Sequence, residues 1–147
     1  MDKTKVIMTL ITVGLIAVVV IASLTNNSTE GATIEDVTFE DGVVNIYYFW
    51  QEGCPRCDAQ SEFFERIEAE WGEYFNVYAF EVLSNADNAR LLNEVAELLD
   101  MRVSGVPFTV IGETTFVGFN ERMEDGFINA IRVGVNQDYD VFKEIVE

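Results

Sequence analysis

The only two cysteines of the chain, Cys54 and Cys57, stand three positions apart, with Pro55 and Arg56 between them. A run of strand-forming residues precedes the pair and a helical pattern follows it, which places Cys54 at the start of a helix. Unpartnered backbone N–H groups and the helix dipole favour a thiolate there. Cys57 then lies on the same helical face and can attack a mixed disulfide that Cys54 has formed. The spacing predicts thiol–disulfide exchange, with Cys54 as the nucleophile and Cys57 as the resolving thiol.

The two residues between the cysteines suit the same chemistry. Pro55 fits the first turn of a helix because it needs no N–H partner and its φ is preset. Arg56 adds positive charge near the Cys54 sulfur, whereas Glu52 opposes that charge. We expect Pro55 and Arg56 to modulate the reactivity of Cys54.

Other uses of a cysteine pair remain open at this point. A zinc site needs four ligands, and a chain with two cysteines and no histidine could complete one only through a dimer or through carboxylates. An iron–sulfur cluster shared by two subunits would likewise have too few cysteine and histidine ligands from each chain. A purely structural disulfide is the stronger alternative, although so short a loop removes little chain entropy. Disulfide exchange itself requires no metal and no organic cofactor.

Composition excludes several other functions. The chain has no histidine, which rules out a Ser-His-Asp triad, a Cys-His pair and an imidazole general base. Nine Lys and Arg residues stand against 26 Asp and Glu residues, for a net charge of −17. A surface this acidic repels phosphate backbones, so we expect no nucleic-acid partner.

The cysteines must be positioned by an alternation of strands and helices. Residues 43–50 (VVNIYYFW) predict a buried strand, and the spacing of apolar residues through position 71 predicts the helix that follows. A second strand is predicted over residues 74–83, with Val77, Ala79 and Val82 on one face, and a second helix over residues 85–100. A hairpin of residues 108–111 and 114–117, a helix over residues 120–133 and a helical continuation within residues 136–147 complete the pattern. This order predicts an α/β fold.

An uncharged apolar run occupies residues 6–24 (VIMTLITVGLIAVVVIASL). As a helix it reaches roughly 28 Å, which is close to the hydrocarbon thickness of a bilayer. Lys3 and Lys5 place residues 1–5 in the cytoplasm by the positive-inside rule. We therefore expect a transmembrane signal anchor over residues 6–24, a polar linker over residues 25–36 and an extracytoplasmic domain over residues 37–147. The alternative is a secretory signal cleaved near Ala22 and Ser23, which would release the domain.

The residues around the cysteines resemble the thioredoxin superfamily. The resemblance rests on the aromatic strand that ends at Trp50 and leads into Cys54 and Cys57, on the order of strands and helices, and on Val106-Pro107 before the hairpin. It implies a three-layer fold with a mixed central sheet. It also implies a cis Val106–Pro107 peptide packed against the cysteines, where the backbone of Val106 pairs with an extended substrate. Trp50 matches an aromatic residue of the family's strand.

The sequence departs from that family in two places. Gly53 precedes the first cysteine and Pro55 follows it, which is closer to the Cys-Pro-x-Cys of glutaredoxins and of some extracytoplasmic oxidoreductases. Tyr48 occupies the position, six residues before Cys54, where thioredoxin has a buried acid that assists proton removal. Asp58 and Glu62 are the candidates to substitute for that acid.

Two functions follow from these features. The first is a membrane-tethered, extracytoplasmic thiol–disulfide oxidoreductase whose partners are cysteine-containing exported proteins or a membrane redox partner. The second is a non-catalytic module of the same fold that binds a membrane partner. A reactive Cys54 would distinguish the first from the second.

Overall fold

Residues 31–146 are the part of the chain that the computed structural model describes, and they alternate between strands and helices along the chain. The predicted α/β alternation is confirmed. The elements are η1 (Ile34–Asp36), β1 (Val44–Trp50), α2 (Pro55–Trp71), β2 (Phe75–Glu81), α3 (Ala86–Leu98), β3 (Phe108–Ile111), β4 (Thr114–Val117), η2 (Glu121–Met123), α4 (Glu124–Gly134) and α5 (Val141–Val146).

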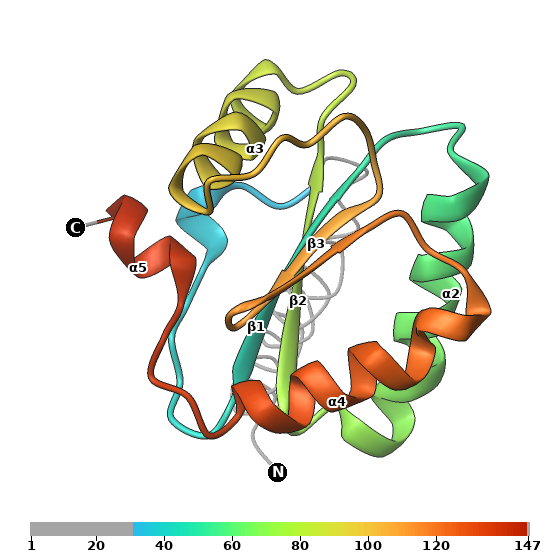
Figure 1. Ribbon diagram of the computed structural model, residues 1–147, viewed down its shortest axis with the longest axis vertical. Coiled ribbons are helices and arrows are strands. Elements are labelled where there is room, and N and C mark those ends of the chain that lie inside the picture. Colours follow the sequence, from blue (N-terminus) through green and yellow to red (C-terminus); the bar gives the residue numbers. More distant parts are fainter. Residues whose placement is uncertain (1–30, 147) are drawn as a thin grey trace, which may run out of the picture. The chain divides into compact units, whose positions relative to one another are not determined.

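The strands form one mixed sheet in the order β2-β1-β3-β4. Figure 1 shows this sheet between α3 on one side and α2 and α4 on the other. β1 and β2 are parallel, whereas β1 pairs with β3 and β3 with β4 in antiparallel fashion. The carboxyl ends of β1 and β2 therefore lie at the same end of the sheet as the amino end of β3. The register pairs Phe49 with Phe108, which brings Pro107 beside Trp50 at that end.

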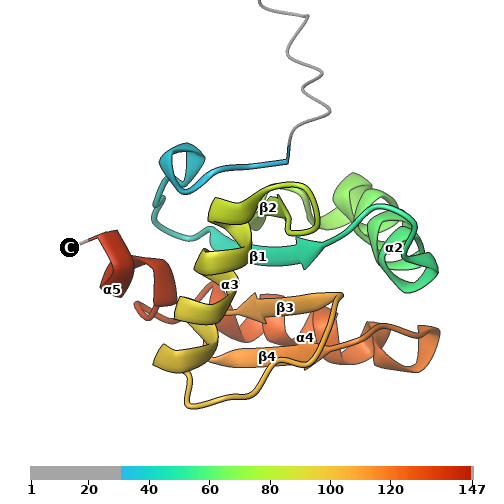
Figure 2. The ribbon, with the colours of Figure 1, turned by 90° about the horizontal axis from the view of Figure 1, so that it is seen from above.

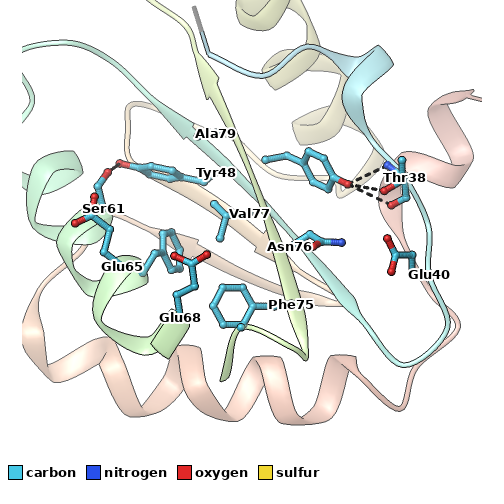
Figure 3. Close-up of a pocket in the computed structure, with 13 residues that line it drawn as sticks. Thr38, Glu40, Tyr48, Ser61, Glu65, Glu68, Phe75, Asn76, Val77 and Ala79 are labelled. Carbon is cyan, nitrogen blue, oxygen red and sulfur yellow. Dashed lines mark hydrogen bonds between the residues drawn. The ribbon is translucent and has the colours of Figure 1, made fainter. Parts of the chain in front are cut away.

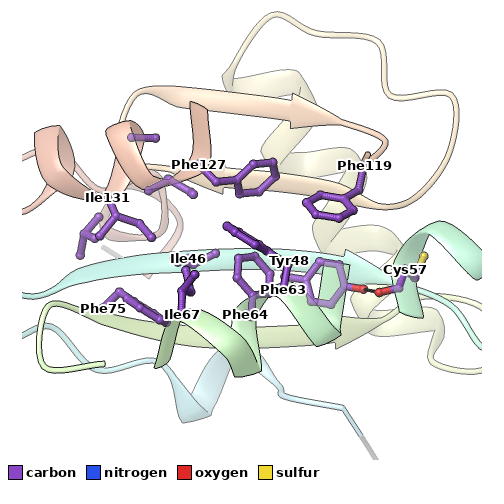
Figure 4. Packing of buried hydrophobic residues seen from close by; sticks show 13 residues of the cluster. Ile46, Tyr48, Cys57, Phe63, Phe64, Ile67, Phe75, Phe119, Phe127 and Ile131 are labelled. Atoms are coloured by element: carbon purple, nitrogen blue, oxygen red, sulfur yellow. Dashed lines mark hydrogen bonds between the residues drawn. The ribbon is translucent and has the colours of Figure 1, made fainter. Parts of the chain in front are cut away.

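Helices cover both faces of the sheet, so the fold has three layers. In Figure 2, α3 lies in front of the strands and α4 behind them. A first buried cluster joins the sheet to α2 and α4 and includes Phe63, Phe64 and Phe127 (Figure 4). A second cluster joins the opposite face to α3 and α5 and includes Val95 and Phe142. β1 lies between the two clusters, and its inward-pointing aromatic residues alternate between them.

Two elements differ from the sequence prediction in detail. The predicted face of β2 holds Val77 and Ala79, but Val82 packs in the second cluster on the opposite side. Strand alternation requires this, because Val82 lies an odd number of positions from Val77 and Ala79. The predicted helix over residues 120–133 begins with the separate turn η2, and the tail forms the short helix α5.

The segment before β1 belongs to the folded unit from Gly31 onward. The N–H of Ala32 donates to the carbonyl of Ala79 on β2 at 2.7 Å, and the side-chain amide of Asn88 donates to the carbonyl of Ala32 at 3.1 Å. Ile34 packs against the second cluster. Of the linker expected over residues 25–36, residues 31–36 are therefore held on the domain by backbone pairing and apolar contact.

The predicted membrane span over residues 6–24 lies outside the described residues. Within residues 31–146, no helix combines the length and the apolar character that crossing a bilayer demands.

The contact between α4 and β1 predicts a sensitive position at Gly134. A Cβ added there would lie 2.6 Å from Val44 Cγ2 and 3.3 Å from Val44 Cβ. A valine within a strand is stiff about χ1, so the two elements would have to separate. We expect Gly134→Ala to lower the free energy of unfolding by about 1–3 kcal/mol, measured by urea titration of the fluorescence of Trp50 and Trp71.

Gly126→Ala, in the same helix, is the matched control. Its added Cβ would make an ordinary contact with Phe116 at 3.4 Å. The substitution should stabilise the protein by about 0.5–1 kcal/mol because alanine favours the helix. Equal effects at the two positions would show that α4 does not pack on β1 as closely as described.

Candidate functional site

Cys54 and Cys57 form a disulfide at the amino end of α2. Cys54 is the residue that caps the helix, in an extended backbone conformation, and Pro55 is the first helical residue. Cys54 is half-buried, whereas Cys57 is only 1 % exposed. An incoming thiolate can therefore reach the sulfur of Cys54 and not that of Cys57.

The start of the helix directs polar groups at Cys54. The N–H of Cys57 points at Cys54 Sγ from 3.2 Å, and the N–H groups of Cys57 and Asp58 donate to the Cys54 carbonyl at 2.9 and 3.0 Å. In the reduced protein, the same N–H and the helix dipole would stabilise negative charge on Cys54 Sγ. The geometry thus favours Cys54 as the attacking and leaving sulfur.

The Val106–Pro107 peptide bond is cis and lies beside the cysteine pair, as the resemblance implies. Cys54 Sγ is 3.9 Å from the carbonyl oxygen of Val106. The carbonyl of Pro107 accepts a 2.7 Å hydrogen bond from the N–H of Gly118, which joins this loop to the end of β4. Two segments about fifty residues apart in the sequence are thereby held together at the sulfur.

The three predicted modulating residues surround this arrangement. Pro55 and Arg56 are exposed on the first turn of α2. The Arg56 guanidinium lies over Gly118, where a Cβ would come within 3.7 Å of Nη1. Trp50 packs against the first cluster, and its buried Nε1 has no hydrogen-bond partner among the described residues. Arg56 is thus the residue that brings positive charge to the rim of the site.

Tyr48 lies beneath the buried cysteine. Its hydroxyl donates to the carbonyl of Cys57 at 2.8 Å (Figure 4). The same hydroxyl lies 3.3 Å from the hydroxyl of Ser61. Burial raises the pKa of Tyr48 to about 12, helped by the negative charge of Asp58 and opposed by the hydrogen bond with Ser61. The hydroxyl therefore stays neutral at physiological pH and acts as a donor. Asp58 and Glu62, the expected substitutes for a buried acid, are both exposed, because they point away from the sheet on α2.

A second neutral pair ties α2 to β3 behind the cysteines. Gln60, one turn after Cys57, is fully buried, and its amide donates to the hydroxyl of Thr109 at 2.6 Å. Its Oε1 is buried without a partner in the described part of the chain. This contact was not foreseen from the sequence, since nothing local pairs position 60 with position 109.

The loop after β2 leaves the sheet at the same end as the site and was also missed. Glu81 is buried, and its carboxylate accepts hydrogen bonds from the backbone N–H groups of Leu83, Ser84 and Asn85 and from the Ser84 hydroxyl. Burial alone would raise the pKa of Glu81, but these hydrogen bonds outweigh it and hold the pKa below its ordinary value. The fixed loop presents Leu83, 67 % exposed, at the sheet end where Trp50 pairs with Glu81.

Metal ligands do not gather in the described region: across residues 31–146, no group of three or more Cys, Asp and Glu side chains is placed to hold an ion.

Comparison with known proteins bears on the fold alone. No protein-family model matches the sequence, and no curated protein matches it. Among solved structures, a thioredoxin-like protein from Clostridium perfringens matches with a TM-score of 0.50 and 19 % identity, over 72 % of this chain and 81 % of that one. The chain has a thioredoxin-like fold. Thioredoxin from Malassezia sympodialis is also similar, with a TM-score of 0.47 and 21 % identity, over 69 % of this chain and 82 % of that one.

Fold and disulfide together support thiol–disulfide oxidoreductase activity. The thioredoxin-like fold brings a cis-proline loop to the amino end of the helix that carries the Cys-x-x-Cys pair. One sulfur is accessible, the other is buried, and the two are joined. Exchange requires a disulfide with a sulfur that an incoming thiolate can reach, and Cys54 supplies that sulfur.

Tyr48→Phe tests whether the tyrosine only donates a hydrogen bond. We expect the free energy of unfolding to fall by about 1 kcal/mol, because two hydroxyl contacts are lost. The pH profile of Cys54 alkylation in the reduced protein should stay unchanged from about pH 6 to about pH 9, since a hydroxyl with a pKa of about 12 does not titrate there. Tyr78→Phe, which removes a hydroxyl bonded to Thr38, is the control. A profile that moves only in Tyr48→Phe would show that Tyr48 exchanges a proton.

Glu81→Gln tests the anchoring of the loop before α3. A carboxylate whose pKa is lowered by folding adds stability above its unfolded pKa of about 4.3, and that stability disappears as the pH falls through the folded value. At neutral pH the variant should unfold with a free energy about 1–3 kcal/mol lower, because charged hydrogen bonds are lost. The difference from the wild type should shrink in acid. Exposed Glu94→Gln on α3 should change little at any pH, and a Glu81→Gln deficit that persists in acid would contradict the assignment.

Proposed function

We propose that this protein is an extracytoplasmic thiol–disulfide oxidoreductase, tethered to the membrane by residues 6–24. The observation that carries the proposal is the disulfide of Cys54 and Cys57 at the amino end of α2, 3.9 Å from the carbonyl of Val106 in the cis-proline loop. Exchange needs an accessible sulfur that can carry negative charge and a second sulfur within bonding distance. The described residues supply both.

The reaction begins at Cys54 in either direction. In the oxidised protein, a substrate thiolate attacks Cys54 Sγ, forms a mixed disulfide and displaces Cys57 as a thiolate, which takes up a proton. A second substrate thiolate then attacks the substrate sulfur of the mixed disulfide and releases Cys54. The substrate leaves with a disulfide, and two electrons remain on the cysteine pair. The reverse sequence reduces a substrate disulfide and restores the bond between Cys54 and Cys57.

The cis-proline loop would hold the substrate during these steps. Val106 is half-buried, and its carbonyl oxygen faces the reactive sulfur. A substrate chain in extended form can pair its backbone with that of Val106 while its cysteine meets Cys54. Pro107 closes the loop against β4 through its own carbonyl. Leu83 and Arg56 are exposed at the same end of the sheet and would contact residues next to the substrate cysteine.

Location and partners rest on the sequence. The apolar run over residues 6–24 and the preceding Lys3 and Lys5 support an anchor with its amino end in the cytoplasm. The domain would then meet cysteine-containing exported proteins or a redox partner in the membrane. Cysteine pairs outside the cytoplasm are exposed to oxidants, which suits a chain whose two cysteines form a disulfide.

Replacing each cysteine separately tests the chemistry and the roles. With Cys54→Ser, exchange with a disulfide-containing protein should fall to the uncatalysed background, because serine cannot form the mixed disulfide. With Cys57→Ser, the first step remains and resolution is lost, so mixed disulfides with client proteins should accumulate and be visible on non-reducing gels. Exchange at the wild-type rate by Cys54→Ser would overturn the assignment of roles to the two cysteines. Cysteines that resist alkylation after reduction would favour a non-catalytic binding module instead.

A further inference from the structure

A groove of about 530 Å³ lies between α2 and the outer edge of β2, and neither cysteine lines it. We call it the edge groove. Phe75 and Val77 of β2 give it an apolar floor (Figure 3). Phe64 of α2 also lines the groove. Val77 is 37 % exposed, although it shares its face of the strand with residues of the first cluster. α2 therefore leaves part of the sheet uncovered at this edge.

The rim of the edge groove is acidic. Glu65 and Glu68 project from α2 on one side, and Glu40 lies on the other side of β2 (Figure 3). All three carboxylates are exposed, and no Lys or Arg is among the described residues that line the groove. The rim thus favours a positively charged occupant.

Within residues 31–146, outward backbone groups of β2 along this groove are also unpaired. The N–H of Val44 donates to Tyr74 and the N–H of Val82 donates to Trp50, so the even-numbered residues of β2 point their polar backbone groups at β1. Because successive residues of a strand point their N–H and C=O groups to opposite sides, the odd-numbered residues of β2 point these groups away from β1. The outward groups of Phe75 and Val77 have no backbone partner in the described part of the chain. Such an edge is a template for an added strand.

Among the described residues, the chain before β1 covers this edge only at its far end. The N–H of Ala32 pairs with the carbonyl of Ala79, and Gly31 approaches so closely that a Cβ there would lie 2.8 Å from that oxygen. From Thr33 the chain turns into η1 and packs on the opposite face of the sheet instead of continuing along β2. In the part of the chain that the structure describes, the edge therefore stays open beside Val77.

We propose that the edge groove docks an extended segment of another polypeptide with Lys or Arg at alternate positions. Added along β2, such a segment would pair with the outward backbone groups of Phe75 and Val77. Its alternate side chains would lie on the α2 side, where their stems cover Val77 and their charges meet Glu65 and Glu68. A second copy of this chain fits poorly, because its own acidic rim would face this one. The surface uses neither cysteine, so the proposal stands apart from the redox chemistry.

Peptide titration of the oxidised full-length chain, in a non-ionic detergent, tests the docking. The probe is a cysteine-free peptide of alternating Lys and Thr, and the comparison peptide has Glu in place of Lys. We expect the Lys peptide to shift the backbone amide NMR signals of Val77 and Ala79 and to bind more weakly as salt is raised. Equal binding of the Glu peptide, or shifts confined to other surfaces, would overturn the proposal.

Charge reversal on the rim supplies the matched comparison. Glu65→Lys combined with Glu68→Lys should weaken binding of the Lys peptide by about tenfold or more. The same change on α3, Glu94→Lys combined with Glu97→Lys, should leave binding near the wild-type value and controls for net charge. If both variants lost affinity for the Lys peptide equally, the binding would be non-specific electrostatic attraction to an acidic protein, and the proposal would be overturned. Sedimentation showing that the wild type pairs with itself through this edge would also overturn it.

Both charge-reversal variants retain the cysteine pair and should keep the wild-type rate of disulfide exchange. Loss of peptide binding with exchange intact supports the docking surface, whereas loss of exchange in the cysteine variants concerns only the proposed activity.

Discussion

Residues 44–49 of β1 are all buried, and Trp50 is the first residue of that strand to reach the surface. Because β1 is covered on both faces, the chain reaches the surface only after the strand ends. The loop that carries Cys54 therefore lies at the end of the sheet. Phe63 and Phe64 then hold α2 against the first cluster, which fixes where the helix begins. The position of the reactive sulfur depends on this enclosure more than on any contact of the sulfur itself.

The polar groups beneath the disulfide are neutral. Tyr48 donates to the carbonyl of Cys57, and Gln60 joins α2 to Thr109, with no carboxylate buried among them. Charge on Cys54 Sγ would therefore be stabilised from the surface side, where the N–H of Cys57 and the helix dipole point at it. A buried carboxylate would resist the formation of a thiolate nearby, and a neutral hydroxyl does not. The site combines a buried cysteine, Cys57, with a polar but uncharged support.

Within the described residues, the outer edge of β2 is covered by other residues near its carboxyl end but not near Val77. Near Glu81 its carboxyl end is closed, by backbone pairing with Ala32 and by the hydrogen bonds that fix the following loop. Near Val77 its edge is open and lined with carboxylates. Natural sheets use charge to protect an open edge from pairing with itself, and the glutamates serve that purpose here. The same charges select which foreign strand can approach.

Local pattern in the sequence determined the strand–helix junction at Cys54, the hairpin after Pro107 and the apolar faces of the main helices, because periodicity and turn residues act between near neighbours. The resemblance of these motifs to a known family supplied the cis peptide at Val106–Pro107. The tertiary structure alone decided that Tyr48 meets the carbonyl of Cys57, that Ile34 packs on the domain, and that Glu81 holds the loop beside the site. It also left Val77 exposed at an open edge. These outcomes depend on sheet register and on how far α2 extends across the sheet, and such long-range contacts leave no local signal in the chain.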